Sequence, residues 1–569
     1  MRILLVATAF NSLTQRVFAE LGDRGHRVGV ELALSPEALR EAVDRDTPDL
    51  VIAPMLKTAV PREVYAAHTC LIVHPGPPGD RGPSSLDRAV LDAEDRWGVT
   101  VLQAEAEMDA GPVWAWAPCD MPPTGKSDLY RGEIADAALE AVILAVERYA
   151  SGSWTPAEQS AADIRPQVRT RPAVRQPERR IDWAADTTET VLRTLRAADS
   201  QPGVLDELLG GEWFLHGGHR EDRLRGEPGQ LLATHAEAVC RATVDGAVWI
   251  PQLRRRRSPG GPPTCALPAT LALGSGLPDV PDLPDTGPEQ EPAASWSDID
   301  YREEGPVGFL RFSFTGGAMS TSRCRRLLAA YRAACTRPTS VLVLGGTRDF
   351  FSNGIHLGVI ETAPDPATES WHNLLAMDDL VEAVLTTTDR LVVAAVGGNA
   401  AAGGAMLAMA ADEVWCRHGA VLNPHYRLMG LYGSEYWTYT LPRRAGDRTA
   451  ERLARQALPV SAGTAHRMGL VDHVVRCAPG DFTGHVVRLA GRTARAAHTP
   501  ARIAGKKAAL EQQQDRSPLA GYRDAELTRM HRTFFDPDHP YHALRRAFVY
   551  KHKPDRTPEH VRGLLREQP

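Results

Sequence analysis

The chain has 569 residues, of which 43% are hydrophobic and 24% charged, and its formal net charge is −6. These values predict a globular protein of about three or four domains. The negative net charge does not indicate binding to nucleic acid or to an anionic membrane surface. No apolar run reaches the roughly 18–20 residues that span a bilayer. The eight cysteines form no CxxC pair, which favours a reducing cytoplasm and predicts neither a disulfide framework nor a metal site.

Short apolar segments alternate with segments of helical spacing over the first quarter of the chain. We expect strands and helices in turn, with strands at 2–7, 27–32, 49–53 and 70–74 and helices at 13–24, 37–43 and 130–149. This alternation predicts a parallel α/β sheet. The turn after the first strand lacks GxGxxG, so the fingerprint of a dinucleotide site is absent.

A smaller segment and a second α/β pattern follow. The smaller segment has a helix at 188–198 and strands at 238–243 and 247–251, and residues 258–295 are dense in proline and glycine, as linkers are. The second pattern has strands at 307–314, 340–345 and 391–396 and a helix at 323–334, and the C-terminal region is helical and basic. We therefore predict domains at 1–155, 175–257 and 299–490, a linker at 258–298 and a helical region at 491–569.

One candidate site lies at the end of the strand 70–74. His74 closes this strand before a loop of small residues, and Asp109 follows a later strand. Ligands of open α/β sheets bind at the carboxyl ends of the strands. A histidine and a carboxylate held together there can take a proton from an attacking nucleophile, since the carboxylate orients the imidazole and stabilises its cation. We therefore predict that His74 and Asp109 are catalytic.

The same region resembles the folate-dependent formyltransferases. The resemblance rests on Val73-His74, Gly98-Val99-Thr100 and Met108-Asp109-Ala110-Gly111, and the segment 178–254 is similar to the C-terminal domain of methionyl-tRNA formyltransferase. It implies 10-formyltetrahydrofolate as the donor and an Asn, His, Asp set in which His74 and Asp109 are the last two. Ile72 stands where the family has Asn. Loss of a hydrogen-bond donor such as this Asn costs about 2.7–4 kcal/mol of transition-state stabilisation. A thiol acceptor, which is a stronger nucleophile than an amine, would suit a site without the Asn.

A second candidate site lies in two glycine-rich turns of the C-terminal half. Ile355 follows Gly354, and Gly403 opens a helical run after Gly397-Gly398. Their backbone N–H groups can together hold the oxygen of a thioester or acyl group. Residues 305–475 resemble the crotonase (enoyl-CoA hydratase/isomerase) superfamily, in which Ile355 and Gly403 fall on the two oxyanion-hole positions.

The acids of this second site depart from the crotonase pattern. The two glutamates of the hydratases are replaced by Met406 and His425, so the usual addition of water to an enoyl-CoA is not expected. Glu435 lies among aromatic residues, where burial would raise its pKa and let it pass a proton. We predict Glu435 as the proton carrier, with Tyr426, Tyr436 and His425 beside it.

The fusion of these two parts resembles a family of hydrogenase maturation factors, most clearly in the stretches 102–116 and 431–439. This resemblance implies a Rossmann-like formyltransferase sheet, a small β-rich, OB-like middle domain and a crotonase-like domain with a helical tail. It also implies a cytoplasmic bifunctional enzyme that transfers a formyl group from 10-formyltetrahydrofolate to coenzyme A and decarbonylates formyl-CoA to CO and CoA. The CO would become a ligand of NiFe-hydrogenase, whose maturation proteins are the candidate partners besides the small-molecule substrates.

Coenzyme A would have to reach both sites, and its phosphates need cations, for which arginine is well suited. The residues predicted to contact it are Gln15, Arg16, Arg131, Arg545 and Arg546. Two alternatives stay open. One is a formyltransferase that modifies a small amine in a secondary pathway and uses its second domain only to bind an acyl-CoA. The other is a scaffold without catalysis, against which the retained His74 and Asp109 argue.

Overall fold

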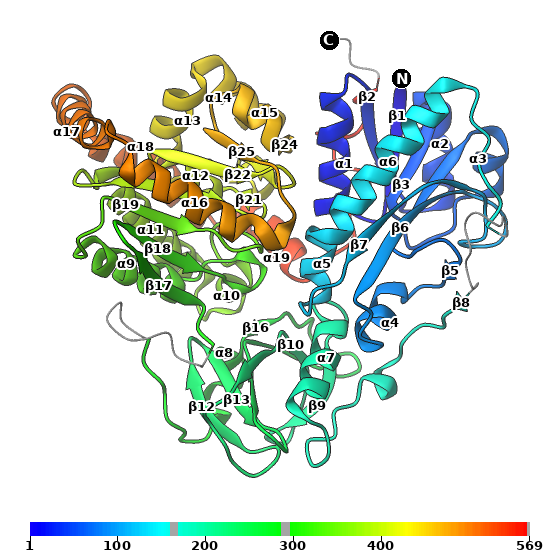
Figure 1. The fold of residues 1–569 in the computed structure, drawn as a ribbon, viewed down its shortest axis with the longest axis horizontal. Coiled ribbons are helices and arrows are strands. Elements are labelled where there is room, and N and C mark those ends of the chain that lie inside the picture. The colour runs from blue at the N-terminus through cyan, green and yellow to red at the C-terminus, as the bar shows by residue number, and fades with distance from the viewer. Residues whose placement is uncertain (160–168, 286–295, 566–569) are drawn as a thin grey trace. The chain divides into compact units, whose positions relative to one another are not determined.

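The computed structural model describes residues 1–159, 169–285 and 296–565, and it divides into two compact units (Figure 1). Unit 1 comprises residues 1–182, 189–206 and 553–569, and unit 2 comprises 183–188 and 207–552. None of the helices among the described residues combines the length and the apolar character needed to cross a membrane.

Unit 1 is built on a six-stranded sheet with the order β2-β1-β3-β4-β6-β7. Its strands are β1 (Arg2–Ala7), β2 (Arg27–Leu32), β3 (Leu50–Met55), β4 (Cys70–His74), β6 (Arg96–Gln103) and β7 (Val113–Asp120). The first four are parallel, as predicted, while β6 and β7 run antiparallel to their neighbours. The short connection between β6 and β7 carries no helix, and a connection of that kind can only reverse the chain.

Helices cover both faces of this sheet. Helices α2 (Pro36–Asp46) and α3 (Arg62–Ala67) pack on the face that carries Leu4 and Val6, while α1 (Ser12–Asp23) contacts α6 (Glu133–Ser151), which lies along β6 and β7. The segment 553–565 returns to the same sheet. The Thr557 hydroxyl donates to Glu31 at 2.5 Å and accepts from the Leu32 N–H at 2.9 Å, and Leu565 joins the apolar cluster around Leu4.

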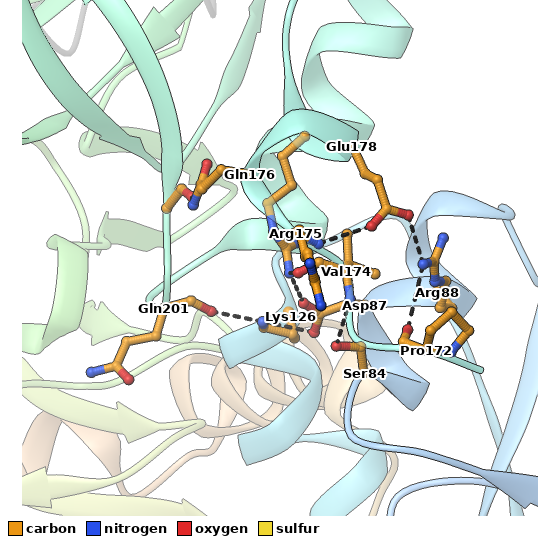
Figure 2. A network of polar contacts seen from close by, with 12 residues as sticks. Ser84, Asp87, Arg88, Lys126, Pro172, Val174, Arg175, Gln176, Glu178 and Gln201 are labelled. Atoms are coloured by element: carbon orange, nitrogen blue, oxygen red, sulfur yellow. Dashed lines mark hydrogen bonds and ion pairs between the residues drawn. The ribbon is translucent and has the colours of Figure 1, made fainter. Parts of the chain in front are cut away.

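A network of buried charges fastens the segment 169–182 to the rest of unit 1 (Figure 2). Asp87 of α4 (Ser85–Leu91) accepts from Lys126 of α5 (Lys126–Arg131) at 2.8 Å and from Arg179 of η1 (Gln176–Arg179) at 2.5 Å. Lys126 also donates to the carbonyl of Gln201. Strand β8 (Arg169–Thr170) pairs with β5 (Asp80–Arg81), and these contacts together place Arg171 beside β5.

The β-rich segment forms two four-stranded sheets, in the orders β16-β15-β10-β9 and β11-β14-β13-β12. The strands are β9 (Val204–Leu208), β10 (Gly211–His216), β11 (His219–Glu221), β12 (Leu231–His235), β13 (Ala238–Ala242), β14 (Ala247–Ile250), β15 (Gln252–Arg255) and β16 (Leu267–Pro268). The predicted linker is partly regular, because β16 pairs with β15 and α8 (Ala269–Leu273) follows it. Residues 286–295 of that linker lie outside the described residues.

The rest of unit 2 is organised by a second six-stranded sheet, in the order β17-β18-β19-β20-β22-β25. Its strands are β17 (Ile299–Glu304), β18 (Val307–Phe312), β19 (Val341–Gly345), β20 (Leu391–Val396), β22 (Glu413–Arg417) and β25 (His473–Val475). Strand β20 is buried on both faces: Val392, Ala394 and Val396 enter one apolar core, and Leu391 and Val393 enter another. Such continuous apolar strands are expected in a parallel sheet covered on both sides.

The helices of unit 2 that bear on the site are α9 (Thr321–Cys335), α11 (Pro366–Thr386), α12 (Gly403–Met409), α13 (Trp437–Ala445) and α18 (Leu519–Phe535). Helices α9, α11 and α12 contribute to the first of the two cores, and α16 (Phe482–Arg495) contributes to the second. Helix α17 (Thr499–Arg516), α18 and α19 (Pro540–Val549) form the predicted helical tail. The predicted fold class is confirmed, and the predicted domain boundaries stay predictions.

Candidate active sites

His74 ends β4 and is held between two carboxylates. Its side chain is buried; Nε2 lies 3.1 Å from Asp80 Oδ2, and Nδ1 lies 3.5 Å from Asp109 Oδ1. Asp109 has a left-handed backbone (φ +57°), and its Oδ2 accepts from the Gly82 N–H at 3.2 Å. The structure therefore brings together the predicted pair of His74 and Asp109 and adds Asp80.

The loop after β4 brings the carboxylate of Asp80 into contact with the imidazole of His74. Gly76 has no room for a side chain, since an added Cβ would come within 2.6 Å of both His74 Nε2 and Asp80 Oδ2. Asp80 in turn faces Arg171, whose Nε lies 3.2 Å from Asp80 Oδ1. Sequence reasoning missed Asp80 and Arg171. A carboxylate six residues beyond His74, in a loop that glycines allow to fold back, was the only available signal for Asp80.

The two carboxylates set the protonation of His74. Burial alone would lower its pKa, but hydrogen bonds to Asp109 and Asp80, and the charges of both, raise the pKa of His74 to about 9. Burial pushes the pKa of Asp109 up, yet the contact with His74 and the Gly82 N–H bring it below its usual value. At neutral pH the site therefore holds an imidazolium, which can donate a proton and must lose one before it can act as a base.

Ile72 lies on the same strand and packs against the apolar cluster around Leu4 and Val6. Its side chain has no hydrogen-bond donor. The position that holds Asn in the formyltransferases is therefore part of the core packing in this chain.

In unit 2, Ile355 and Gly403 are brought together by the turns that precede them. An added Cβ on Gly354, which has φ +81°, would lie 3.2 Å from the Gly403 nitrogen, so only glycine leaves that approach open. Within the described parts of the chain, neither the Ile355 N–H nor the Gly403 N–H donates to a protein acceptor. Two such neighbouring donors can hold a carbonyl oxygen.

Glu435 lies against Gly403. An added Cβ at Gly403 would come within 2.5 Å of Glu435 Oε1. The other carboxylate oxygen, Oε2, accepts from the Tyr426 hydroxyl at 2.7 Å and from the Ser434 N–H at 3.1 Å. Glu435 is only 2% exposed. One carboxylate oxygen is thus anchored while the other faces the predicted oxyanion hole.

Two further carboxylates surround Glu435, and sequence reasoning missed both. Asp378 of α11 and Glu526 of α18 have no exposed surface. Burial, followed by the charge of Asp378, raises the pKa of Glu435 well above its usual value, and burial likewise raises that of Asp378. Burial raises the pKa of Glu526 to about 7. These groups favour the protonated form of Glu435 at neutral pH, as the prediction of a raised pKa required.

The other residues predicted for this site are His425, Tyr436 and Tyr426, the last of which contacts Glu435. Met406 is buried in α12, and the buried side chains of His425 and Tyr426 line a cavity of about 560 Å³ with Tyr432 and Trp437. Burial raises the pKa of Tyr426 far above its usual value, so its hydroxyl stays protonated and donates to Glu435. Tyr436 adjoins Glu435 in the chain and is fully buried.

The residues predicted to contact coenzyme A fall in both units: Gln15, Arg16 and Arg131 in unit 1, and Arg545 and Arg546 in unit 2. Arg16 is buried against Asp136 at 2.5 Å. Arg545 and Arg546 share Glu361, at 2.8 and 3.1 Å, and Arg545 is only 2% exposed. These arginines therefore already have carboxylate partners, and their contact with coenzyme A stays a prediction.

Comparisons with known proteins also distinguish a formyltransferase-like part and a crotonase-like part of the chain. Residues 318–557 match the enoyl-CoA hydratase/isomerase family, and residues 173–259 match the C-terminal domain of formyl transferases. A hydrogenase maturation factor of Bradyrhizobium diazoefficiens, HoxX, is 46% identical over 99% of this chain and 97% of its own length. HypX from Aquifex aeolicus in complex with tetrahydrofolic acid is 40% identical, covers 100% of this chain and 99% of its own, and superimposes with a TM-score of 0.94. Methionyl-tRNA formyltransferase of Roseiflexus castenholzii is 28% identical over 39% of this chain and 71% of that protein.

Proposed function

Since the chain belongs to the HypX/HoxX family of hydrogenase maturation factors, we propose that it transfers a formyl group from 10-formyltetrahydrofolate to coenzyme A and cleaves formyl-CoA to CO and CoA. The HypX relative was crystallised with tetrahydrofolic acid, which supports a folate donor here. The reaction would take place in the cytoplasm, in keeping with eight free cysteines. The CO would be passed to NiFe-hydrogenase or to its maturation proteins.

His74 would serve the first step as a proton carrier. A thiol must lose a proton and the departing folate nitrogen must gain one when the formyl carbon changes partner. The imidazolium of His74 can donate to that nitrogen and regain a proton from the thiol, while Asp109 and Asp80 keep the ring oriented. The positive charge of His74 would also favour a thiolate at the site, which suits the absence of an Asn at Ile72.

Glu435 would serve the second step. A formyl thioester has no α-carbon, so the enolate chemistry of crotonases has no counterpart. The N–H groups of Ile355 and Gly403 fit the thioester oxygen, and Glu435 beside them can remove the formyl proton as the carbon–sulfur bond breaks. Glu435 then returns the proton to the leaving thiolate. The products are CO and CoA, and no redox partner is needed.

The observation that carries this proposal is the placement of a buried, protonatable Glu435 against Gly403, in a chain that also carries the His74–Asp109 pair. For the phosphates of coenzyme A we propose Arg131 and Arg546 first, with Gln15 near the first site. Arg16 and Arg545 are buried against carboxylates and would have to leave them.

The full chain incubated with coenzyme A and a donor ¹³C-labelled in its formyl group tests the proposal. We expect labelled formyl-CoA by mass spectrometry and labelled CO trapped by a haem protein, both dependent on coenzyme A. Label that moves to a small amine, with neither formyl-CoA nor CO formed, would contradict the proposal and support the alternative amine formyltransferase.

A further inference from the structure

The turn that presents Glu435 has an unusual backbone. Glu435 and the next residue, Tyr436, both have left-handed φ angles, +60° and +57°. Residues other than glycine rarely adopt this backbone conformation. Two such residues in succession persist only where the surrounding structure holds them. The orientation of Glu435 toward Gly403 depends on this turn, because the side chain leaves the backbone from it.

Asp378 binds the first part of the turn. Its Oδ1 accepts from the Glu435 N–H at 2.7 Å, and its Oδ2 accepts from the Ser434 hydroxyl at 2.8 Å. Both contacts are buried, and Asp378 comes from α11, which lies 57 residues away in the chain. A carboxylate is well suited here because it offers two acceptors and no donor.

Glu526 binds the second part of the turn. Its Oε2 accepts from the Tyr436 N–H at 2.9 Å, and its Oε1 accepts from the Thr438 N–H at 2.8 Å and from the Thr438 hydroxyl at 2.5 Å. Helix α13 begins at Trp437, and its N-cap residue, Tyr436, makes no capping hydrogen bond through its own side chain. Glu526 of α18 therefore supplies the acceptor for the first N–H groups of the helix that an N-cap side chain would otherwise supply.

We propose that Asp378 and Glu526 are positioning residues, which hold the left-handed turn at Glu435 and thereby direct its carboxyl group at the oxyanion hole. This inference rests on the proposed role of Glu435 in cleaving formyl-CoA. It assigns a task to two buried carboxylates that face the candidate catalytic group.

The charges around Glu435 allow the effect of Asp378 on the position of Glu435 to be distinguished from its effect on the pKa of Glu435. The ionisable groups that face it are Asp378 from α11, Glu526 from α18, Tyr426, and Cys324 from α9. The guanidinium of Arg523 in α18 lies 3.9 Å from Asp378, but it binds Asp379 at 2.5 Å and Glu382 at 2.7 Å. After burial, the charge of Asp378 does most to raise the pKa of Glu435, so its removal would lower that pKa.

Asp378→Ala, Asp378→Asn and Glu526→Gln in the full chain test the proposal, with formyl-CoA supplied directly. Asn can still accept from the Glu435 N–H and donate to the Ser434 hydroxyl, whereas Gln cannot accept from both the Tyr436 and the Thr438 N–H groups. We expect Asp378→Ala and Glu526→Gln to lower kcat for CO release at least tenfold at unchanged KM. Asp378→Asn should restore most of kcat and shift the pH profile to lower pH, because the negative charge is gone.

Asp379→Ala is the matched control, since Asp379 is the next residue of α11 and binds Arg523 rather than the turn. It should retain the wild-type kcat. Amide hydrogen exchange of the peptide containing residues 434–438 gives a readout without activity, and exchange should accelerate in Asp378→Ala and Glu526→Gln but not in Asp379→Ala. Wild-type kcat and wild-type exchange in both variants would overturn the proposal. A wild-type rate of CO release in Glu435→Gln would instead refute the proposed second step, while the exchange data would still decide whether the two carboxylates hold the turn.

Discussion

The two candidate sites place buried carboxyl groups in opposite electrostatic settings. In unit 1, Asp109 and Asp80 enclose His74, so the imidazolium keeps the pKa of Asp109 low while the carboxylates raise that of His74 to about 9. In unit 2, Glu435 is buried beside Asp378 and Glu526, and its pKa is raised. Burial raises the pKa of every carboxyl group and is the largest cause in unit 2. The pKa of Asp109 falls because the contact with the His74 imidazolium and the Gly82 N–H together outweigh burial.

This difference suits two different tasks. A paired imidazolium stays charged and can give a proton to a leaving nitrogen, whereas a carboxyl group with a raised pKa is, once ionised, a stronger base that can take a proton and return it within one reaction. The two sites should therefore respond differently to substitution and to pH.

Glu435→Gln should have the largest effect. Glutamine keeps the shape of the side chain but cannot carry the proton, so CO release from supplied formyl-CoA should fall about 10³-fold. Formation of formyl-CoA from the folate donor should be unchanged, because His74 and Asp109 lie in the other unit. Rates of formyl-CoA formation and of gas release, measured separately, check this. A loss of both activities would show that the two sites are not independent.

Each site also has a glycine whose Cα hydrogen faces the ionisable group. The substitution Gly403→Ala would place a methyl group 2.5 Å from Glu435 Oε1, and Gly76→Ala would place one 2.6 Å from His74 Nε2. Displacement of a reacting group by about an ångström can cost on the order of 10²-fold. We therefore expect Gly403→Ala to slow only CO release and Gly76→Ala to slow only formyl transfer.

The controls for these variants are Gly521→Ala in unit 2 and Gly22→Ala in unit 1, where an added Cβ meets no atom within 4 Å. Both should behave as wild type. Equal losses of the two activities in Gly403→Ala and Gly76→Ala would point to general destabilisation and contradict the assignment of each glycine to one site.

The pH dependences of the two steps should have opposite slopes. Glu435 removes a proton only when it is ionised, so CO release should rise with pH, about tenfold per unit below the raised pKa of Glu435. His74 must be protonated to donate, so formyl transfer should fall as the pH rises through about 9. Initial rates of each step between pH 6 and about 10 would show CO release rising and formyl transfer falling with pH. Parallel profiles would remove the contrast.

Asp80→Asn should have the smallest effect on rate and a clear effect on titration. With one of the two flanking carboxylates neutral, the pKa of His74 should fall from about 9 toward its ordinary value of about 6.5. Titration of the His74 ring followed by NMR measures this shift. Asp92→Asn is the control, because Asp92 binds Arg171 at 2.9 Å but not His74. An unchanged pKa in Asp80→Asn would mean that Asp109 alone holds the imidazolium.

Local patterns in the sequence predicted much of the fold. Strands β1, β2 and β4 have the predicted bounds, because each is a short buried run bounded by polar or turn residues. The antiparallel direction of β6 and β7 was not predicted, since an apolar run carries no information on direction. Strand β16 and helix α8 lie within the segment predicted as a linker, because its high proline and glycine content does not exclude short regular elements.

The sites were predicted only in part, for a similar reason. The sequence pointed to His74, Asp109, Ile355, Gly403 and Glu435, which stand in local motifs, and the structure brings each set together. The carboxylates that contact the turn at Glu435 follow no motif. Asp378 and Glu526 reach the turn at Glu435 from helices 57 and 90 residues away, and only the packing of those helices determines that contact.

The segment 553–565 has a consequence for the order of folding. Thr557 completes the hydrogen bonding of Glu31 and Leu32, and Leu565 fills the apolar cluster of β1 and α2. As a ribosome makes the chain from its N-terminus, the sheet of unit 1 emerges long before these residues do. Until residues 553–565 have been made, Glu31 and Leu32 lack the Thr557 hydroxyl and the apolar cluster lacks Leu565, and a fragment cut after residue 206 would lack these contacts altogether.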